Sequence, residues 1–87
     1  MIFAIKNLMR KSYSKEDREL LIKVGKRIRE LRLQSGLSQE KLAFASNLDR
    51  TYIGSVERGE RNISVINLNK ISTALNINSF ELLKIAE

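Results

Sequence analysis

The chain contains no cysteine, histidine, proline or tryptophan among its 87 residues. The absence of cysteine excludes disulfide bonds and thiolate nucleophiles. Because histidine is absent as well, neither a zinc site nor a histidine-based catalytic triad can be built. An enzyme would depend on carboxylate, lysine, serine or tyrosine groups alone. We therefore expect a protein without catalysis, bound metal or cofactor.

Aromatic residues and long apolar runs are also scarce. Phenylalanine and tyrosine make up 6% of the chain, too few for a platform on which single-stranded nucleic acid stacks. The N-terminal stretch MIFAIKNLM is apolar, but it is too short to span a bilayer and lacks the features of a signal peptide. It either packs on the domain as a strand or helical turn, or takes part in a dimer contact. The sequence predicts a cytoplasmic protein with no membrane partner.

The residues that are present favour one small helical domain. Hydrophobic residues make up 43% of the chain, which is typical of a globular protein. Leucine, isoleucine, lysine, arginine and glutamate are abundant, and all of them are compatible with helices. A chain of this length buries a modest core, so a surface shared between two chains would add stability.

Positive charge dominates the chain, with a net charge of +6 and a pI of about 10. A basic domain of this size suggests a polyanionic partner, usually nucleic acid and sometimes a membrane surface. Residues 1–35 hold ten Lys/Arg and four Asp/Glu, residues 36–62 hold four of each, and residues 63–87 hold two of each. Because the excess lies at the N-terminal end, bulk charge does not identify the binding surface.

Capping residues and turn residues divide the chain into five helices. Each helix is preceded by a residue suited to the N-cap: Ser14, Ser38, Asp49, Ser64 and Asn78. Gly36, Asn47 and Gly59 supply the left-handed conformation that ends the first three helices. The expected helices span residues 14–35, 39–46, 50–58 and, as a pair, 64–86.

Apolar residues recur at helical spacing in these segments, and no run alternates for long enough to form a strand. The residues expected to face inward are Leu20, Val24, Ile28, Leu31, Leu42, Ala43, Ala45, Ile53, Val56, Val65, Leu68, Ile71, Ser72 and Leu75. Glu81 is expected to complete a capping box with Asn78. The prediction is a single all-α domain over residues 1–87, with residues 1–13 as an N-terminal extension.

The second and third helices are joined by the three-residue turn Asn47-Leu48-Asp49. This is the spacing of a helix-turn-helix, here spanning residues 38–58, in which a tight turn holds the second helix across the first. The first helix then rests on the phosphate backbone, and the second offers its N-terminal residues to the major groove.

The segment GLSQEKLAFASNLDRTYIGSVERGERNISVINLNKISTALNI resembles the Cro/repressor-type (XRE-like) helix-turn-helix regulators. The matching pieces are LSQEKLA, YI..VERGERN and L.KI..AL.I followed by ELL, with VGKRIRELR ahead of them, covering about residues 24–83. Within that family, LDRTYI and ERGERN look most like the controller proteins of restriction-modification systems. The resemblance implies a compact five-helix DNA-binding domain of the lambda-repressor-like type. It also implies a small dimeric regulator that times expression of the nuclease.

Three positions depart from the family pattern. Asn47 stands where the family often has glycine, Gly54 where it usually has serine, and Ile63 where it often has proline. Glycine inside a helix costs about 1 kcal/mol relative to alanine. We therefore expect Gly54 to mark a close approach of its helix to DNA or to a neighbouring helix.

Nine residues are expected to contact DNA: Ser38, Gln39, Arg50, Thr51, Tyr52, Ser55, Arg58, Arg61 and Asn62. Gln39 opens the second helix, where a helix N-terminus suits a phosphate, and the resemblance places glutamine at this spot. Arg50 can pair with guanine. Thr51 and Tyr52 can meet bases or phosphates, and Ser55 shares a helix face with Thr51.

Structural roles are the alternatives for several of these residues. Arg50 and Ser55 are otherwise solvent-exposed, and Tyr52 otherwise packs into the core. Arg61 is expected to read bases or clamp a phosphate, while Asn62 binds phosphate or holds its loop.

Glu57 is expected to be structural, because a carboxylate facing DNA would repel phosphates. It pairs with a nearby arginine or caps local amides, and Arg58 is either its partner or a phosphate contact. The cations of the first helix form a solvated face, or attract DNA and contact flanking phosphates. These residues are Lys23, Lys26, Arg27, Arg29 and Arg32.

Apolar residues that remain after the core is filled indicate a self-association face. The resemblance implies that a homodimer forms through the fourth and fifth helices, and we expect Ile66, Phe80 and Ile85 at the interface. Alternatively, these residues complete the core of the monomer. Two-fold pairing would place two recognition helices about one DNA turn, ~34 Å, apart, which predicts a palindromic operator.

Two function classes follow. The first is a transcription regulator that binds double-stranded operator DNA, with RNA polymerase as a candidate second partner. The second is an antitoxin-type or other protein-interaction module with an autoregulatory DNA-binding domain. A toxin-sized reading frame beside the gene would favour the second class, whereas nuclease and methyltransferase genes would favour the first.

Overall fold

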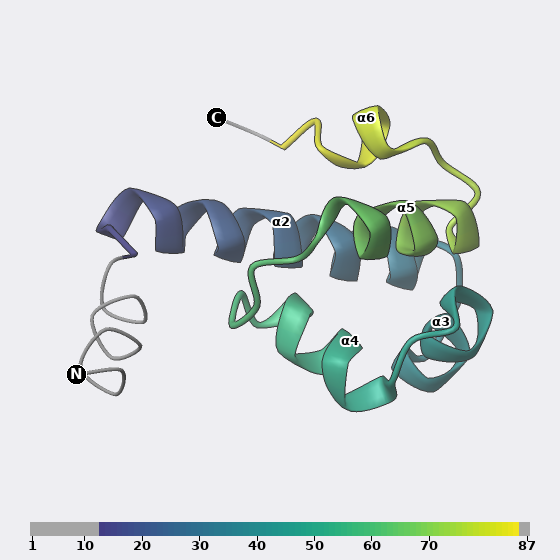
Figure 1. Ribbon diagram of the computed structural model, residues 1–87. Helices are drawn as coiled ribbons and strands as arrows, with labels where there is room; N and C mark the ends of the chain where they lie inside the picture. The colour runs from purple at the N-terminus through teal and green to yellow at the C-terminus, as the bar shows by residue number, and fades with distance from the viewer. Residues whose placement is uncertain (1–12, 86–87) are drawn as a thin grey trace.

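Five α-helices and no strand make up the described part of this computed structural model, residues 13–85 (Figure 1). The helices are α2 (Lys15–Gln34), α3 (Gln39–Ser46), α4 (Arg50–Glu57), α5 (Val65–Ala74) and α6 (Ser79–Leu82). The prediction of an all-α fold is confirmed. The interpretation of MIFAIKNLM falls outside the described residues. None of the helices within residues 13–85 is long and apolar enough to cross a membrane.

Each helix begins at the N-cap expected for it. The side chain of the capping residue accepts a backbone N–H of the first turn at Ser14, Ser38, Asp49, Ser64 and Asn78. The capping box expected at Asn78 is only half formed. Glu81 donates its N–H to Asn78 at 2.8 Å, but its carboxylate pairs with Lys84 at 2.8 Å instead of turning back to the cap. The hydrogen bond from Lys84 lowers the pKa of the Glu81 carboxyl.

Left-handed residues end the helices at tight turns. Gly36 after α2 and Gly59 after α4 have φ values of 71° and 75°, and Asn47 after α3 has a φ of 56°. These are the three positions expected to be left-handed. Asn76 after α5 is a fourth, with a φ of 57°. Asparagine tolerates this conformation better than most residues with a side chain.

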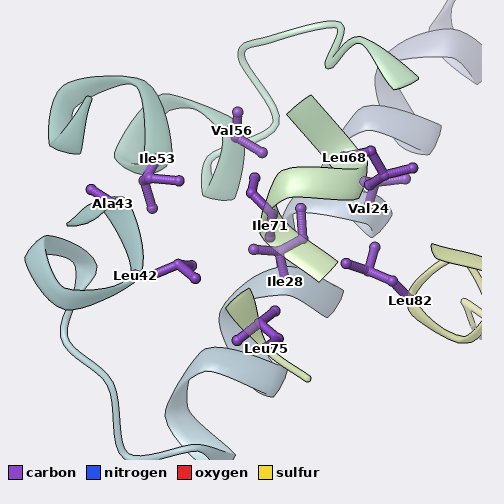
Figure 2. Close-up of a cluster of buried hydrophobic side chains, with 10 residues drawn as sticks. All are labelled: Val24, Ile28, Leu42, Ala43, Ile53, Val56, Leu68, Ile71, Leu75 and Leu82. Carbon is purple, nitrogen blue, oxygen red and sulfur yellow. The ribbon is translucent and has the colours of Figure 1, made fainter. Parts of the chain in front are cut away.

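One hydrophobic core joins all five helices (Figure 2). Its buried members are Val24, Ile28, Leu42, Ala43, Ile53, Val56, Leu68, Ile71, Leu75 and Leu82. α2 packs against α4, α4 against α3, α3 against α5, and α5 against α6. In Figure 1, α4 and α6 lie on opposite sides of α2. The core therefore fixes the angle between α3 and α4, the two helices of the candidate site.

Three positions expected to face inward are exposed instead. Leu20 is 51% exposed because the N-terminal half of α2 extends beyond α4 and α5 (Figure 1). Val65 is 81% exposed in the first turn of α5, and Ala45 is exposed on α3. Helical spacing identifies an apolar stripe, but it does not show where the neighbouring helices end.

Gly25 lets α2 approach the end of α4 more closely than any other residue would. A Cβ atom at this position would collide with the carbonyl oxygen of Val56 and lie 2.8 Å from that of Glu57. Real Cβ atoms do not approach backbone atoms this closely. The requirement for glycine at position 25 is therefore steric, and it places the last turn of α4 directly against α2.

Candidate nucleic-acid interface

The turn between α3 and α4 has the geometry expected of a helix-turn-helix. Asn47 leaves α3 in the left-handed conformation, and the N–H of Leu48 returns to the carbonyl of Ala43 at 2.9 Å. Leu48 is half-buried and packs against the core. Asp49 then caps α4 by accepting the N–H of Thr51 at 2.9 Å. Backbone bonds, a side-chain cap and an apolar anchor thus hold the turn in one shape.

The first turn of α4 presents two side chains to solvent. Arg50 and Thr51 are both exposed, and the positive end of the helix dipole lies beneath them. Neither side chain is drawn into the core. This exposure is what direct contact with base edges or phosphates requires, and it leaves both expected roles of Arg50 open.

Tyr52 contacts the core through its ring and the candidate interface through its hydroxyl. Its ring is half-buried and packs against the hydrophobic core. Its hydroxyl oxygen accepts a hydrogen bond from Nδ2 of Asn67, in α5, at 3.2 Å. The guanidinium carbon of Arg61 lies 5.6 Å from the ring centroid, within the range of a cation–π contact. Tyr52 therefore combines core packing of its ring with a hydrogen-bonded hydroxyl.

Ser55 is not the exposed residue that its shared face with Thr51 suggested. It is only 5% exposed. Its Oγ donates to the Tyr52 carbonyl at 2.8 Å and accepts from Nε of Arg61 at 3.1 Å. The hydroxyl is thereby occupied as donor and as acceptor, because the loop after α4 folds back and brings Arg61 over it. Ser55 supports Arg61 from below.

Gln39 opens α3 and is tied to α4. The preceding residue, Ser38, caps α3 by accepting the N–H of Lys41 at 3.1 Å. Nε2 of Gln39 donates to Oε1 of Glu57 at 3.2 Å. A side-chain amide carries two N–H groups, so one remains for an acceptor outside the protein. The carboxylate therefore fixes the direction in which Gln39 presents its amide.

Glu57 pairs with an arginine, Arg32 of α2, and of the two alternatives for Arg58 the one that made it the partner of Glu57 is wrong. Nε and Nη2 of Arg32 donate to the two carboxylate oxygens at 2.6 and 3.0 Å, and Nη1 donates to the Leu37 carbonyl at 2.8 Å. Both side chains are buried. The bidentate pair forms because Gly25 brings the end of α4 against α2. Arg32 accordingly does not belong to a solvated face.

Arg58 pairs with Glu60 at the surface instead. Nε and Nη2 donate to the carboxylate at 2.8 and 3.1 Å. The hydrogen bond raises the pKa of Arg58 and lowers the pKa of Glu60. Both side chains remain more than half exposed, so the contact is open to exchange with another anion. Arg61 and Asn62 follow in the loop and are also exposed.

Comparison of the sequence with known protein families agrees with the helix-turn-helix geometry of α3 and α4. A helix-turn-helix family model matches residues 28–82, which is more than half of the chain. The chain belongs to the helix-turn-helix family. The match begins in the second half of α2 and runs through α6, so it includes α3, α4 and the turn between them.

The relatives of this helix-turn-helix protein include restriction-modification controllers. Control protein C.BamHI of Bacillus amyloliquefaciens is 52% identical over 60 residues, covering 68% of this chain and 74% of the relative. The crystal structure of the controller C.AhdI from Aeromonas hydrophila matches with a TM-score of 0.70 and 60% identity, covering 71% of this chain and 94% of that one. The structure of the C.Esp1396I tetramer with its natural 35 base-pair operator matches with a TM-score of 0.68 and 45% identity, covering 74% and 88%. The resemblance to controller proteins is confirmed.

Some cationic side chains of α2 are exposed in this helix-turn-helix protein, and others are buried or half-buried. Lys23, Lys26 and Arg29 are exposed, as expected for a solvated face. Arg27 is half-buried and donates to the carbonyls of Glu81 and Leu82 at 3.1 and 3.4 Å, which satisfies the end of α6. Arg27 therefore has a structural role that a count of charges did not reveal.

The expected dimer residues differ in their exposure. Ile66 is 70% exposed and Phe80 is 85% exposed, so these two side chains are free to meet another surface. Ile85 is half-buried and packs against the core, which agrees with the alternative that it completes the monomer. Val65 is exposed beside Ile66, although its helical spacing predicted a place in the core.

Proposed function

We propose that this protein is a restriction-modification controller: a dimeric transcription regulator that binds a palindromic operator in double-stranded DNA. The observation that carries the proposal is the exposed first turn of α4, held by the capped turn from α3. The similarity to C.BamHI and C.AhdI supports it. Such a protein acts beside DNA in the cytoplasm, and RNA polymerase is the second partner that a regulator of transcription initiation would meet.

Affinity and register come from contacts with phosphates. The N-terminus of α3 offers backbone N–H groups together with Ser38 and Gln39, and helix N-termini favour anions. Asn62 reaches phosphate from the loop after α4. Arg58 exchanges its exposed contact with Glu60 for a phosphate. These contacts are independent of base identity, so they bring the protein to DNA without selecting a sequence.

Specificity comes from the start of α4 and from Arg61. Arg50 is the residue best suited to pair with O6 and N7 of guanine, a contact worth about 1–3 kcal/mol of discrimination. Thr51 offers a methyl group and a hydroxyl beside it. Tyr52 on the same helix and Arg61 in the loop that follows it form a second polar group. Ser55 contributes by holding Arg61 and has no direct role in reading bases.

The dimer forms through the exposed apolar residues of α5 and α6. Ile66 and Phe80 are the exposed members of the expected interface, and Val65 extends the patch. A two-fold axis at this surface turns two copies of α4 toward successive major grooves, about 34 Å apart. Each half of the operator then repeats the other in inverted orientation.

A binding titration separates the two kinds of contact. We expect Arg50→Ala to reduce the preference for operator over single-base variants by about tenfold, in line with one lost bidentate pair. Gln39→Ala should weaken binding to all duplexes alike, because it removes a phosphate contact and no base contact. An Arg50→Ala protein with an unchanged preference would contradict the assignment of Arg50.

A further inference from the structure

Asn67 lies on α5, outside the helix-turn-helix, yet it contacts the reading face of α4. Its Nδ2 donates to the hydroxyl oxygen of Tyr52 at 3.2 Å across 15 residues of sequence. Asn67 itself is half-buried, and its backbone N–H is bonded to Oγ of Ser64, the N-cap of α5, at 3.1 Å. The side chain that bonds to Tyr52 is therefore carried by the capped first turn of that helix.

The hydrogen bond from Asn67 makes the Tyr52 hydroxyl a hydrogen-bond donor toward DNA. Because the oxygen accepts from Asn67, the hydroxyl proton remains available to an acceptor on DNA. A hydroxyl that accepts one hydrogen bond becomes a stronger donor for the next. The ring has two torsions, and its packing against the core together with the bond at its tip fixes both.

Tyr52, which Asn67 contacts, also contacts Arg61 and Ser55. The ring that Asn67 holds in place lies under the guanidinium of Arg61, 5.6 Å from its centroid. Arg61 is bonded in turn to Ser55, whose Oγ also binds the backbone of Tyr52. Asn67, Tyr52, Arg61 and Ser55 thus form one group connected by polar contacts, in which Asn67 supplies a hydrogen bond from outside α4 and the following loop.

We propose that Asn67 is a positioning residue for specificity: it holds Tyr52, and through Tyr52 the cation of Arg61, in the arrangement that reads the operator. This inference rests on the proposed function, because it assigns a determinant of the same DNA site. It adds that the reading surface is assembled before DNA arrives. It also connects the reading surface to α5, the helix that carries the exposed dimer residue Ile66.

The test compares Asn67→Ala with Asn69→Ala, the same chemical change two residues along the same helix. Asn69 is exposed, and its amide oxygen accepts a 3.4 Å hydrogen bond from Ser79, remote from Tyr52. The probes are the duplex that the wild-type protein enriches from a random pool, its single-base variants and a scrambled duplex. Asn67→Ala should lower the preference for the enriched duplex about three- to tenfold, the range of one neutral hydrogen bond. Affinity for the scrambled duplex should stay within about twofold of wild type, because phosphate contacts are untouched.

A second arm measures the contact without DNA. Tyr13→Phe leaves Tyr52 as the only tyrosine, since the chain has two. In that background, Asn67→Ala should shift the NMR signals of the Tyr52 ring and of the Arg61 Nε–H group, whereas Asn69→Ala should leave both in place. In a Tyr52→Phe background, Asn67→Ala should have no further effect on preference, because the bonded hydroxyl is gone.

The outcomes separate the two claims. Equal loss of affinity for all duplexes, or an equal effect of Asn67→Ala with Tyr52 and with Phe at position 52, would show a purely structural Asn67 and overturn the positioning role. Unchanged ring signals would overturn it as well. A wild-type protein that enriches no sequence would instead overturn the proposed function, and with it the specificity that Asn67 is said to serve.

Discussion

Gly54 shows how one missing side chain shapes the candidate interface. A Cβ atom there would lie 3.2 Å from Nη1 of Arg58 and 3.5 Å from Oε1 of Gln39. Gly54 is buried in α4 beneath these two side chains. The nearest atom belongs to Arg58, the C-cap of the same helix, and the contact with Gln39, the first residue of α3, is of ordinary van der Waals length. Both atoms are at the ends of flexible side chains, so the side chains around Gly54 have room to adapt.

Gly54→Ala is therefore expected to have opposite effects on folding and binding. Alanine favours the helix by about 1 kcal/mol, so the free energy of unfolding measured in urea should rise by about 0.5–1 kcal/mol. Displacement of Gln39 and Arg58 should weaken DNA binding across all duplexes. Gly25→Ala is the control, because its Cβ meets backbone carbonyls and should destabilise the fold strongly. Lower stability in Gly54→Ala would contradict this explanation.

At the scale of elements, a buried ion pair connects three helices. Arg32 of α2 and Glu57 of α4 form the pair, and Gln39 of α3 donates to the same carboxylate. The helices, their caps and the turn were predictable from sequence because those signals are local. The ion pair was not, because its partners are 25 residues apart and nothing in their spacing indicates contact. For the same reason the sequence predicted a structural role for Glu57 but did not identify Arg32 as its partner.

Glu57→Gln should show how much the Arg32–Glu57 ion pair contributes to the free energy of unfolding. Removing one charge leaves the guanidinium of Arg32 buried without its counter-ion, which typically costs about 3–5 kcal/mol. Glu60→Gln is the matched control, since the Arg58–Glu60 pair is exposed and should contribute at most about 1 kcal/mol. Urea unfolding of both variants gives the comparison. Equal losses of stability for the buried and the exposed glutamate would refute the distinction.

At the scale of the whole molecule, the apolar residues expected at the dimer interface lie on different helices from the basic face of α2. Ile66 and Phe80 are exposed on α5 and α6, whereas Lys23, Lys26 and Arg29 are exposed on α2, which also carries exposed leucine and isoleucine side chains. The apolar face was expected from the residues left after filling the core. Its membership could not be fixed from sequence, because Ile85 and Val65 have similar hydrophobicity and opposite environments. Only the positions of the neighbouring helices distinguish them.

The central claim is that two copies of this chain read a two-fold symmetric DNA sequence. Selection of bound duplexes from a random DNA pool tests it most directly, with Phe80→Asp as a variant that places a charge in the apolar face. The wild-type protein should enrich a palindrome whose half-sites are centred about 10 base pairs apart. Phe80→Asp, if still folded by circular dichroism, should lose the symmetric enrichment. A wild-type selection that yields no palindrome would contradict the account.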